Sequence, residues 1–240
     1  PEEGHRPAQH DAARQVATTL GCERSSEDAP AELLLVHAPT GTGKTLAYLV
    51  PLLLWASKNG VRTAVSTYTR ALQEQAYDSD VPRALAALRR AGVLDELRVS
   101  MLKGRENYAC WRSTCLQNPG PDANGEDWLA WTRFLLFSAI DTEGDLDRLP
   151  ETPPVPFADK STWRRADGAL RGRIRARSGC CRLSDDRRTC GAQVARFKAE
   201  RSHVVLTNQA FTLTNPQFAT HIVFDECEHL HDQADSTFSH

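Results

Sequence analysis

The sequence predicts an α/β fold, a parallel sheet with helices on both faces, into which a smaller cysteine-containing unit is inserted. Two observations predict the sheet. Short apolar segments alternate with helix-like segments on either side of residues 104–190, and a Gly-rich turn joins the first apolar segment to a long helix. A third observation predicts the insertion: residues 104–190 hold five of the seven cysteines and the Pro- and Gly-rich loops Asn118–Gly125 and Pro150–Pro156.

The expected elements alternate along the chain. Apolar runs predict strands at 33–37, 61–66, 97–102, 203–207 and 221–224. Helices are expected to begin at Lys44, at Arg70 and after Asp80, and a further helix is expected over 190–201. Asp80 is a residue type that caps helices and Pro82 is favoured in a first turn, so we expect Asp80 to be an N-cap.

Composition restricts the class of protein. The chain has 240 residues, 40% of them hydrophobic, which suffices for one large or two small domains, and no apolar run is long enough for a membrane span. The net charge is −2, although residues 119–151 carry −6 and residues 160–201 carry +9. An odd number of cysteines favours a reducing compartment with metal-bound or free thiols. The chain lacks an initial Met and ends soon after an acidic motif, so we expect a fragment.

The Gly-rich turn has the pattern of a Walker A phosphate loop. Such a loop follows a strand and opens a helix, and its backbone N–H groups and the helix N-terminus hold phosphates. Lys44 is expected to reach the β- and γ-phosphates, and the Thr45 hydroxyl to bind Mg²⁺. The first position is Ala38 where the motif has Gly. The predicted nucleotide-binding residues of the loop are Thr40, Gly41, Thr42, Gly43, Lys44 and Thr45.

A Walker B motif is expected where the last apolar strand ends. Asp225 and Glu226 follow Ile222–Phe224 directly. Asp225 is expected to hold Mg²⁺, and Glu226 to orient or deprotonate the attacking water. Together with the phosphate loop, this acidic pair predicts hydrolysis of a nucleoside triphosphate.

Three further segments make the similarity more specific. They are, in chain order, Ser66–Gln75, then Lys103–Cys110, and then Cys190 followed by Val204–Asn208. The second of them reads Lys-Gly-Arg-Glu-Asn-Tyr-Ala-Cys. In this arrangement the chain resembles superfamily 2 DNA helicases of the XPD/DinG type, which carry an iron–sulfur domain. The resemblance implies a RecA-like lobe formed by residues 1–103 and 191–240, and an iron–sulfur insertion at 104–190. A second motor lobe would be missing from this chain.

The resemblance also implies roles for single residues. Gln9 would contact adenine, and Thr67 and Thr69 would contact phosphates of single-stranded DNA. The Walker B segment 225–228 corresponds to motif II of these helicases, and it reads Asp-Glu-Cys-Glu where the family has Asp-Glu-Ala-His. Glu228 therefore takes the fourth place, and His229 follows one position late. Gln209 stands where the family commonly has His after Thr-Asn. These departures put the coupling of hydrolysis to movement in question more than hydrolysis itself.

The cysteines suit a metal cluster, because four thiolates suit iron–sulfur clusters and soft sulfur ligands also suit zinc. Five candidates compete for four places: Cys110, Cys115, Cys180, Cys181 and Cys190. The resemblance makes Cys110 and Cys190 the first and last ligands of a cluster, expected to be 4Fe-4S. Cys180 and Cys181 are adjacent, so both could bind one cluster only in a tight turn. We therefore expect the ligands to be Cys110, Cys115, Cys190 and one of the adjacent pair, with Cys181 favoured over Cys180. A vestigial domain with free thiols is the alternative.

Residues 160–201, which we call the basic stretch, and the aromatic residues near it are expected to bind nucleic acid. Cationic side chains can follow the phosphates of a single strand, and aromatic rings can stack on its bases. Solvated arginines and packed aromatic residues are the alternative. The expected contacts in and before this stretch are Arg105, Tyr108, Arg173 and Arg175, with Trp111 and Trp163 as further candidates for stacking.

The sequence therefore predicts part of an ATP- and Mg²⁺-dependent DNA helicase that moves 5′ to 3′ on single-stranded or forked DNA in a bacterial-type cytoplasm. The alternative is a nucleic-acid-binding accessory protein of the same fold, plasmid- or CRISPR-associated, with weak or uncoupled ATPase activity. A P-loop kinase is disfavoured by the Ser66–Gln75 segment and the cysteine insertion.

Overall fold

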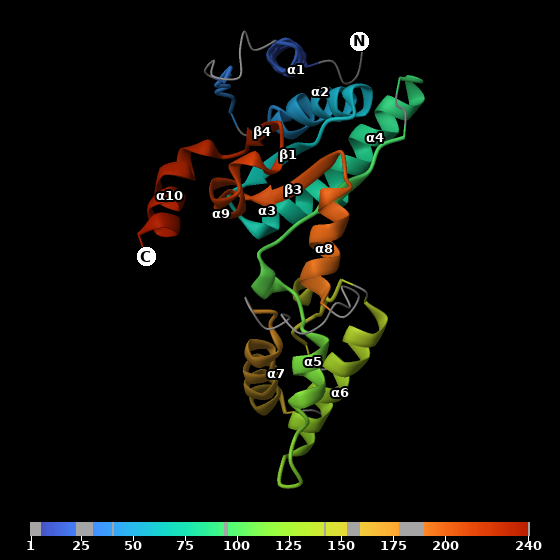
Figure 1. The fold of residues 1–240 in the computed structure, drawn as a ribbon, viewed down its shortest axis with the longest axis vertical. Helices are drawn as coiled ribbons and strands as arrows, with labels where there is room; N and C mark the ends of the chain where they lie inside the picture. Colours follow the sequence, from blue (N-terminus) through green and yellow to red (C-terminus); the bar gives the residue numbers. More distant parts are fainter. Residues whose placement is uncertain are drawn as a thin grey trace. The chain divides into compact units, whose positions relative to one another are not determined.

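The computed structural model describes residues 6–22, 31–39, 41–93, 96–141, 143–152, 159–177 and 190–239. The chain divides into two compact units. We call residues 1–102 with 199–240 the sheet unit, and residues 103–198 the helical unit. Helix α8 (Gly191–Glu200) crosses the boundary between the two units (Figure 1).

The sheet unit contains a parallel sheet with the strand order β2-β3-β1-β4. The strands are β1 (Thr63–Thr67), β2 (Val99–Met101), β3 (Val204–Asn208) and β4 (His221–Phe224). Val65 of the central strand β1 lies opposite Leu206 and Val223. Parallel strands must be joined by crossovers, and helices supply them here, so the predicted parallel α/β architecture is confirmed.

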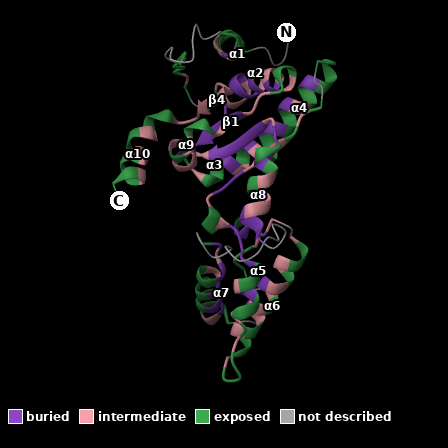
Figure 2. Ribbon diagram, in the orientation of Figure 1, coloured by how far each residue is buried: buried purple, intermediate pink, exposed green. Residues whose placement is uncertain are grey.

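Helices cover both faces of this sheet. The helices of the unit are α1 (Pro7–Leu20), α2 (Lys44–Asn59), α3 (Arg70–Gln75), α4 (Val81–Arg90), α9 (Gln209–Thr214) and α10 (Leu230–Phe238). On one face, Val65, Val204 and Leu206 join a buried cluster with apolar side chains of α2 and α4. On the other face, the Thr212 hydroxyl of α9 donates to Ser66 Oγ at 2.9 Å. The two central strands are accordingly the most buried: β1 is buried along its whole length and β3 at all but its last residue, whereas β4 is half-buried (Figure 2).

The expected strand at 33–37 is wrong. Residues 31–39 have no regular secondary structure, and Leu33 and Leu35 are 87% and 76% exposed. A strand persists only with a hydrogen-bonding neighbour, and the described residues place none beside this segment. Its apolar character is therefore not used for sheet pairing in this structure.

The expected N-cap at Asp80 is also wrong. Asp80 has helical backbone angles, makes no capping hydrogen bond, and ends a π-helical turn, Ala76–Asp80, that connects α3 to α4 without a break. Pro82 is tolerated because it lies in the first turn of α4. The continuous path buries Asp80, which is 8% exposed, instead of leaving it at a helix end.

The helical unit has its own core. Its helices are α5 (Trp111–Leu116), α6 (Gly125–Ile140) and α7 (Lys160–Ile174), with short 3-10 turns at Arg105–Asn107 and Leu146–Arg148. Phe134 of α6 and Trp163 of α7 are fully buried at the centre of this core. The helical unit therefore has an apolar core separate from that of the sheet unit.

No helix in the described ranges is long and apolar enough to cross a bilayer.

Candidate active site

The phosphate loop leads into the long helix α2 as expected. Gly41 and Gly43 have left-handed backbone angles, with φ of +80° and +83°, which side chains disfavour. Gly43 is the N-cap of α2, so Lys44 and Thr45 are its first two residues. The space beside Gly41 is open, because a Cβ placed there would meet no atom within 4 Å. The loop therefore offers free N–H groups and an accessible cradle to an anion. Thr40 lies outside the described residues.

Helix α1 holds this loop from the other side. The Gln9 amide donates to the Gly43 carbonyl at 2.8 Å, and the Arg6 guanidinium donates to the Gly41 carbonyl at 2.9 Å. A Cβ at Gly43 would overlap the Gln9 side chain. The structure thus brings Gln9 to the phosphate loop, where its amide is used to fix the loop backbone.

The acidic pair follows β4 directly. Asp225 donates its N–H to the Ser66 carbonyl at 2.9 Å, which continues the parallel pairing with β1. Glu226 has φ of +53°, and among the described residues it is the one residue other than glycine with positive φ. Strained angles of this kind persist where the surroundings fix them. Here the buried Gln209 amide donates to the Asp225 and Glu226 carbonyls at 3.1 and 3.3 Å.

One hydrogen bond brings the two motifs together. The Tyr48 hydroxyl donates to Asp225 Oδ2 at 2.9 Å. Tyr48 lies one turn after Lys44 and Thr45 on α2, so the loop end of this helix and the acidic end of β4 meet. Burial raises the pKa of Tyr48 well above its usual range, and the Asp225 carboxylate adds to the shift. The hydroxyl therefore remains a donor.

A second carboxyl group lies in the same electrostatic environment. The pKa of Asp80 is raised by burial, with Asp225 contributing in the same direction and Arg83 opposing it.

Carboxylate and hydroxyl oxygens are the ligands that Mg²⁺ prefers. Thr45 and Asp225 therefore fit the predicted magnesium site.

The threonines expected to contact DNA are engaged within the protein. Thr67 is fully buried and its hydroxyl donates to the Thr69 carbonyl at 3.1 Å, so a direct contact of the Thr67 side chain with DNA does not agree with this structure. Thr69 is half-buried and caps α3 by accepting from the Leu72 N–H. Between them, the exposed ring of Tyr68 stacks on His229, with centroids 4.2 Å apart.

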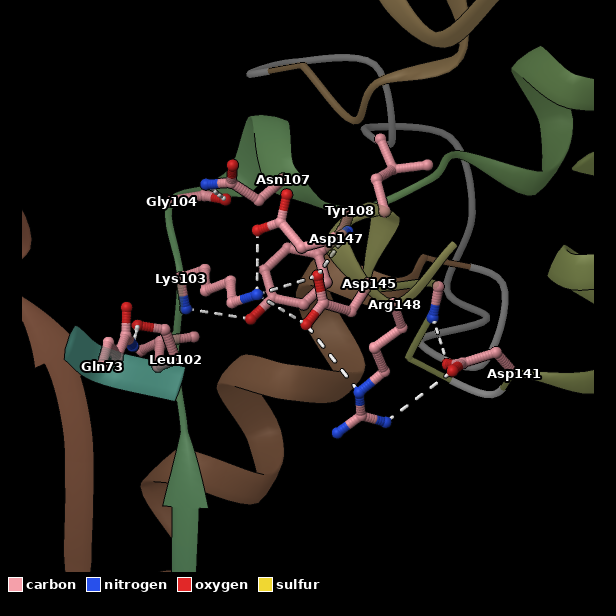
Figure 3. Close-up of polar contacts among 12 residues, drawn as sticks. Gln73, Leu102, Lys103, Gly104, Asn107, Tyr108, Asp141, Asp145, Asp147 and Arg148 are labelled. Carbon is pink, nitrogen blue, oxygen red and sulfur yellow. Dashed lines mark hydrogen bonds and ion pairs between the residues drawn. The ribbon is translucent and has the colours of Figure 1, made fainter. Parts of the chain in front are cut away.

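The Lys103–Cys110 segment is organised around a buried charge, which Figure 3 shows. Lys103 Nζ lies 2.9 Å from Asp145 Oδ2 and 2.9 Å from Asp147 Oδ2, and the Lys103 side chain is 1% exposed. The Lys103 backbone N–H donates to the Tyr108 hydroxyl at 2.9 Å. Tyr108 is 2% exposed, so its expected stacking on a nucleic-acid base is wrong for this structure. Arg105 is exposed.

The basic stretch is partly structural. Trp163 is fully buried, which excludes it from base stacking, whereas Trp111 is 36% exposed. Arg171 donates to the Leu146 and Leu149 carbonyls and pairs with Asp167. The exposed basic residues of this stretch, among those described, are Lys160, Arg164, Arg165, Arg173, Arg177, Arg196, Lys198 and Arg201, and Arg175 is half-exposed.

Two of the cysteines lie together. The backbones of Cys110 and Cys190 pair in an isolated antiparallel β-bridge within the helical unit. Both residues are buried, and both thiols are free. Cys110 precedes α5, and Cys190 precedes α8 at Gly191, where a Cβ would overlap the Glu143 carbonyl. Cys115 is exposed on α5. Cys180 and Cys181 lie outside the described residues, and the described part contains no group of three or more potential metal ligands.

Sequence reasoning missed Tyr48 and the partners of Lys103. Tyr48 carried a signal, because its position four residues after Lys44 places it on the same face of α2. Asp145 and Asp147 carried none, since they lie more than 40 residues from Lys103 and look like ordinary members of an acidic stretch.

The chain is similar to known helicases over part of its length. Residues 13–92 match the DEAD/DEAH box helicase family. Over 79 residues the chain is 46% identical to "ATP-dependent helicase DinG" of Mycobacterium tuberculosis, which covers 33% of the chain and 12% of that protein. It is 38% identical over 107 residues to "ATP-dependent DNA helicase YoaA" of Escherichia coli, covering 45% of the chain and 14% of that protein. It is 29% identical over 253 residues to "ATP-dependent DNA helicase DinG" of Escherichia coli, covering 95% and 32%. The chain therefore matches no more than 32% of the length of any of these three relatives.

Proposed function

Since residues 13–92 match the DEAD/DEAH box helicase family and the chain is homologous over part of its length to DinG and YoaA helicases, we propose that it is the nucleotide-binding part of an ATP-dependent DNA helicase. The observation that carries this proposal is the Tyr48–Asp225 hydrogen bond, because it joins the phosphate-loop helix to the acidic strand end. A site with both parts can bind a triphosphate and place a carboxylate beside it.

Each residue of the site has a defined task in this proposal. The loop N–H groups and the start of α2 bind the phosphates, and Lys44 neutralises their charge. Thr45 and Asp225 would hold Mg²⁺, which supplies further neutralisation of phosphate charge. Glu226 orients the attacking water, and Gln209 keeps the Glu226 backbone in its unusual conformation.

The remaining assignments extend this proposal to the whole protein. Residues 1–103 and 191–240 would be one RecA-like motor lobe, and 104–190 an iron–sulfur insertion. A second lobe would supply the arginine that stabilises transition-state charge. The whole protein would then move 5′ to 3′ along single-stranded or forked DNA, with Thr69, Arg105, Arg173 and Arg175 on its path.

The cluster proposal is supported by the donor set of the helical unit. The buried thiols of Cys110 and Cys190 are brought together by backbone pairing, which suits two ligands of one cluster. Cys115 and one of the adjacent pair Cys180 and Cys181 would complete the set. When bound, the cluster would link segments of the helical unit that are distant in sequence.

Replacing either buried cysteine tests the cluster. We expect Cys110→Ser and Cys190→Ser each to remove iron from anaerobically purified protein and to bleach its visible absorption, because each takes away a thiolate ligand. Nucleotide binding should persist, since the phosphate loop belongs to the sheet unit. Cys22→Ser, at an exposed thiol of the sheet unit, is the matched control. Wild-type protein that contains no iron would contradict the cluster.

A second function is favoured by one contact. His229 follows Glu228, the residue at which motif II differs from the family pattern, and its ring stacks on Tyr68. A His engaged in this way suits an accessory DNA-binding protein with weak or uncoupled ATPase activity.

The stimulation of ATPase activity by DNA separates the two functions. For a helicase, we expect single-stranded DNA to raise the ATPase rate of the whole protein by at least about tenfold, because bound DNA favours closure of the hydrolysis site. An accessory protein should bind the same DNA with little change in rate. Strand separation on a forked duplex with a 5′ tail provides the second measurement, and a fork with a 3′ tail is its control.

A further inference from the structure

We propose that Tyr48 is a positioning residue that holds the Asp225 carboxylate beside Thr45, so that the two oxygen ligands of the divalent cation are in place before nucleotide binds. This inference rests on the proposed nucleotide site. It adds a residue that lies outside both sequence motifs and touches neither phosphate nor water in the proposed chemistry.

The Asp225 carboxylate is oriented by two donors. Its Oδ2 accepts from the Tyr48 hydroxyl at 2.9 Å, and its Oδ1 accepts from the Glu226 N–H at 3.2 Å. The backbone of Asp225 is fixed separately, by the Ser66 carbonyl and the Gln209 amide. Tyr48 is therefore the one side chain in the described part with a hydrogen bond to this carboxylate, and it sets the rotation of the group.

The Tyr48 ring is itself held firmly. Tyr48 is 8% exposed and belongs to the main apolar cluster of the sheet unit, which also contains Leu49 and Leu52 of α2. A tyrosine side chain has only two rotatable bonds, and packing restricts both. The hydroxyl thus acts as a rigid spacer between α2 and the end of β4, which transfers the position of the helix to the carboxylate.

The same helix carries the other proposed ligand. Thr45 is the second residue of α2 and Tyr48 follows about one turn later. Tyr48 therefore links the helix that presents Thr45 to the carboxylate at the end of β4. Partners of metal ligands that fix orientation in this way commonly contribute about 10- to 100-fold to metal affinity.

Tyr48→Phe removes this hydroxyl and keeps the ring in the core. We expect Mn²⁺ to bind the chain in the presence of ADP about tenfold more weakly than it binds wild type. Electron paramagnetic resonance of free Mn²⁺ measures the affinity. Binding of fluorescent ADP in EDTA should change less than twofold, because the loop that holds the phosphates is intact. A purely structural role would weaken both measurements together.

A double-substitution cycle with Asp225→Asn links the effect to the carboxylate. Asp225→Asn alone should weaken Mn²⁺ binding, and adding Tyr48→Phe should weaken it no further, since the hydroxyl acts through Asp225. Tyr108→Phe is the matched control, because it also removes a buried, hydrogen-bonded tyrosine hydroxyl, in the helical unit.

The outcomes separate this inference from the proposed function. Wild type that binds Mn²⁺ only with ADP, while Tyr48→Phe binds it equally well, overturns the role of Tyr48 and leaves the nucleotide site standing. Equal losses with and without metal also overturn it. A wild-type chain that binds neither ADP nor Mn²⁺–ADP contradicts the proposed site and, with it, the inference.

Discussion

Lys44→Ala should reduce ATP turnover by the whole protein by at least about a hundredfold, the range seen when a single donor to transition-state charge is removed. Lys44 is the first residue of α2 and is half-buried at the mouth of the phosphate loop, so the substitution takes away positive charge without opening the core. Initial hydrolysis rates measure the loss, and the thermal midpoint should stay within a few degrees of wild type.

Two companion variants make this result specific. Lys58→Ala removes the same charge from the last turn of the same helix, where the side chain is exposed, and should leave turnover unchanged. Glu226→Gln should keep ATP binding and stop hydrolysis, because it removes the proposed base and no phosphate contact. Normal turnover by Lys44→Ala would refute the site assignment, and lost ATP binding by Glu226→Gln would give Glu226 a structural role.

Lys103→Met should destabilise the helical unit by about 3–5 kcal/mol, the usual cost of leaving one member of a buried ion pair without its partner. Lys103 and Asp145 have side chains only 1% and 3% exposed, so water cannot replace the lost ammonium group. Hydrogen exchange measures the effect by region: amides of residues 104–177 should exchange faster, while those of β1 and β3 keep their protection.

Two controls distinguish burial from charge alone. Arg148→Met removes a cation 3.9 Å from the same Asp145 carboxylate, but its side chain is 47% exposed, so we expect a loss below about 1 kcal/mol. Combining Lys103→Met with Asp145→Asn should recover much of the stability, because no charge then stays buried. Equal losses for Lys103→Met and Arg148→Met would show that the buried pair has no special weight.

The parts of the structure that could be predicted from sequence are those fixed by local geometry. The Gly-rich turn before Lys44 and the acidic pair after β4 depend on a few neighbouring residues, and both take the expected place at element ends. The strand expected at 33–37 failed because pairing depends on residues far away in the chain. Local apolar character cannot report whether a neighbouring strand is present.

Burial explains most of the corrected side-chain roles. Tyr108 and Trp163 are amphipathic residue types that suit both a nucleic-acid surface and a core, and a small helical unit needs large buried side chains. Thr67 ends a strand that is buried on both faces, which a motif alone does not reveal. Tyr48 went unnoticed for the opposite reason, because an aromatic residue in an apolar helix is normally taken as packing.

Gly191 carries a consequence for finding further chains of this architecture by sequence. The backbone there passes so close to the Glu143 carbonyl that no side chain fits, and the residue before it is Cys190. A replacement at Gly191 would displace the start of α8 and carry the thiol away from Cys110. A search pattern for this end of the helical unit should therefore require the dipeptide Cys-Gly, and hits with any other residue after the cysteine should be expected to have lost the Cys110–Cys190 pairing.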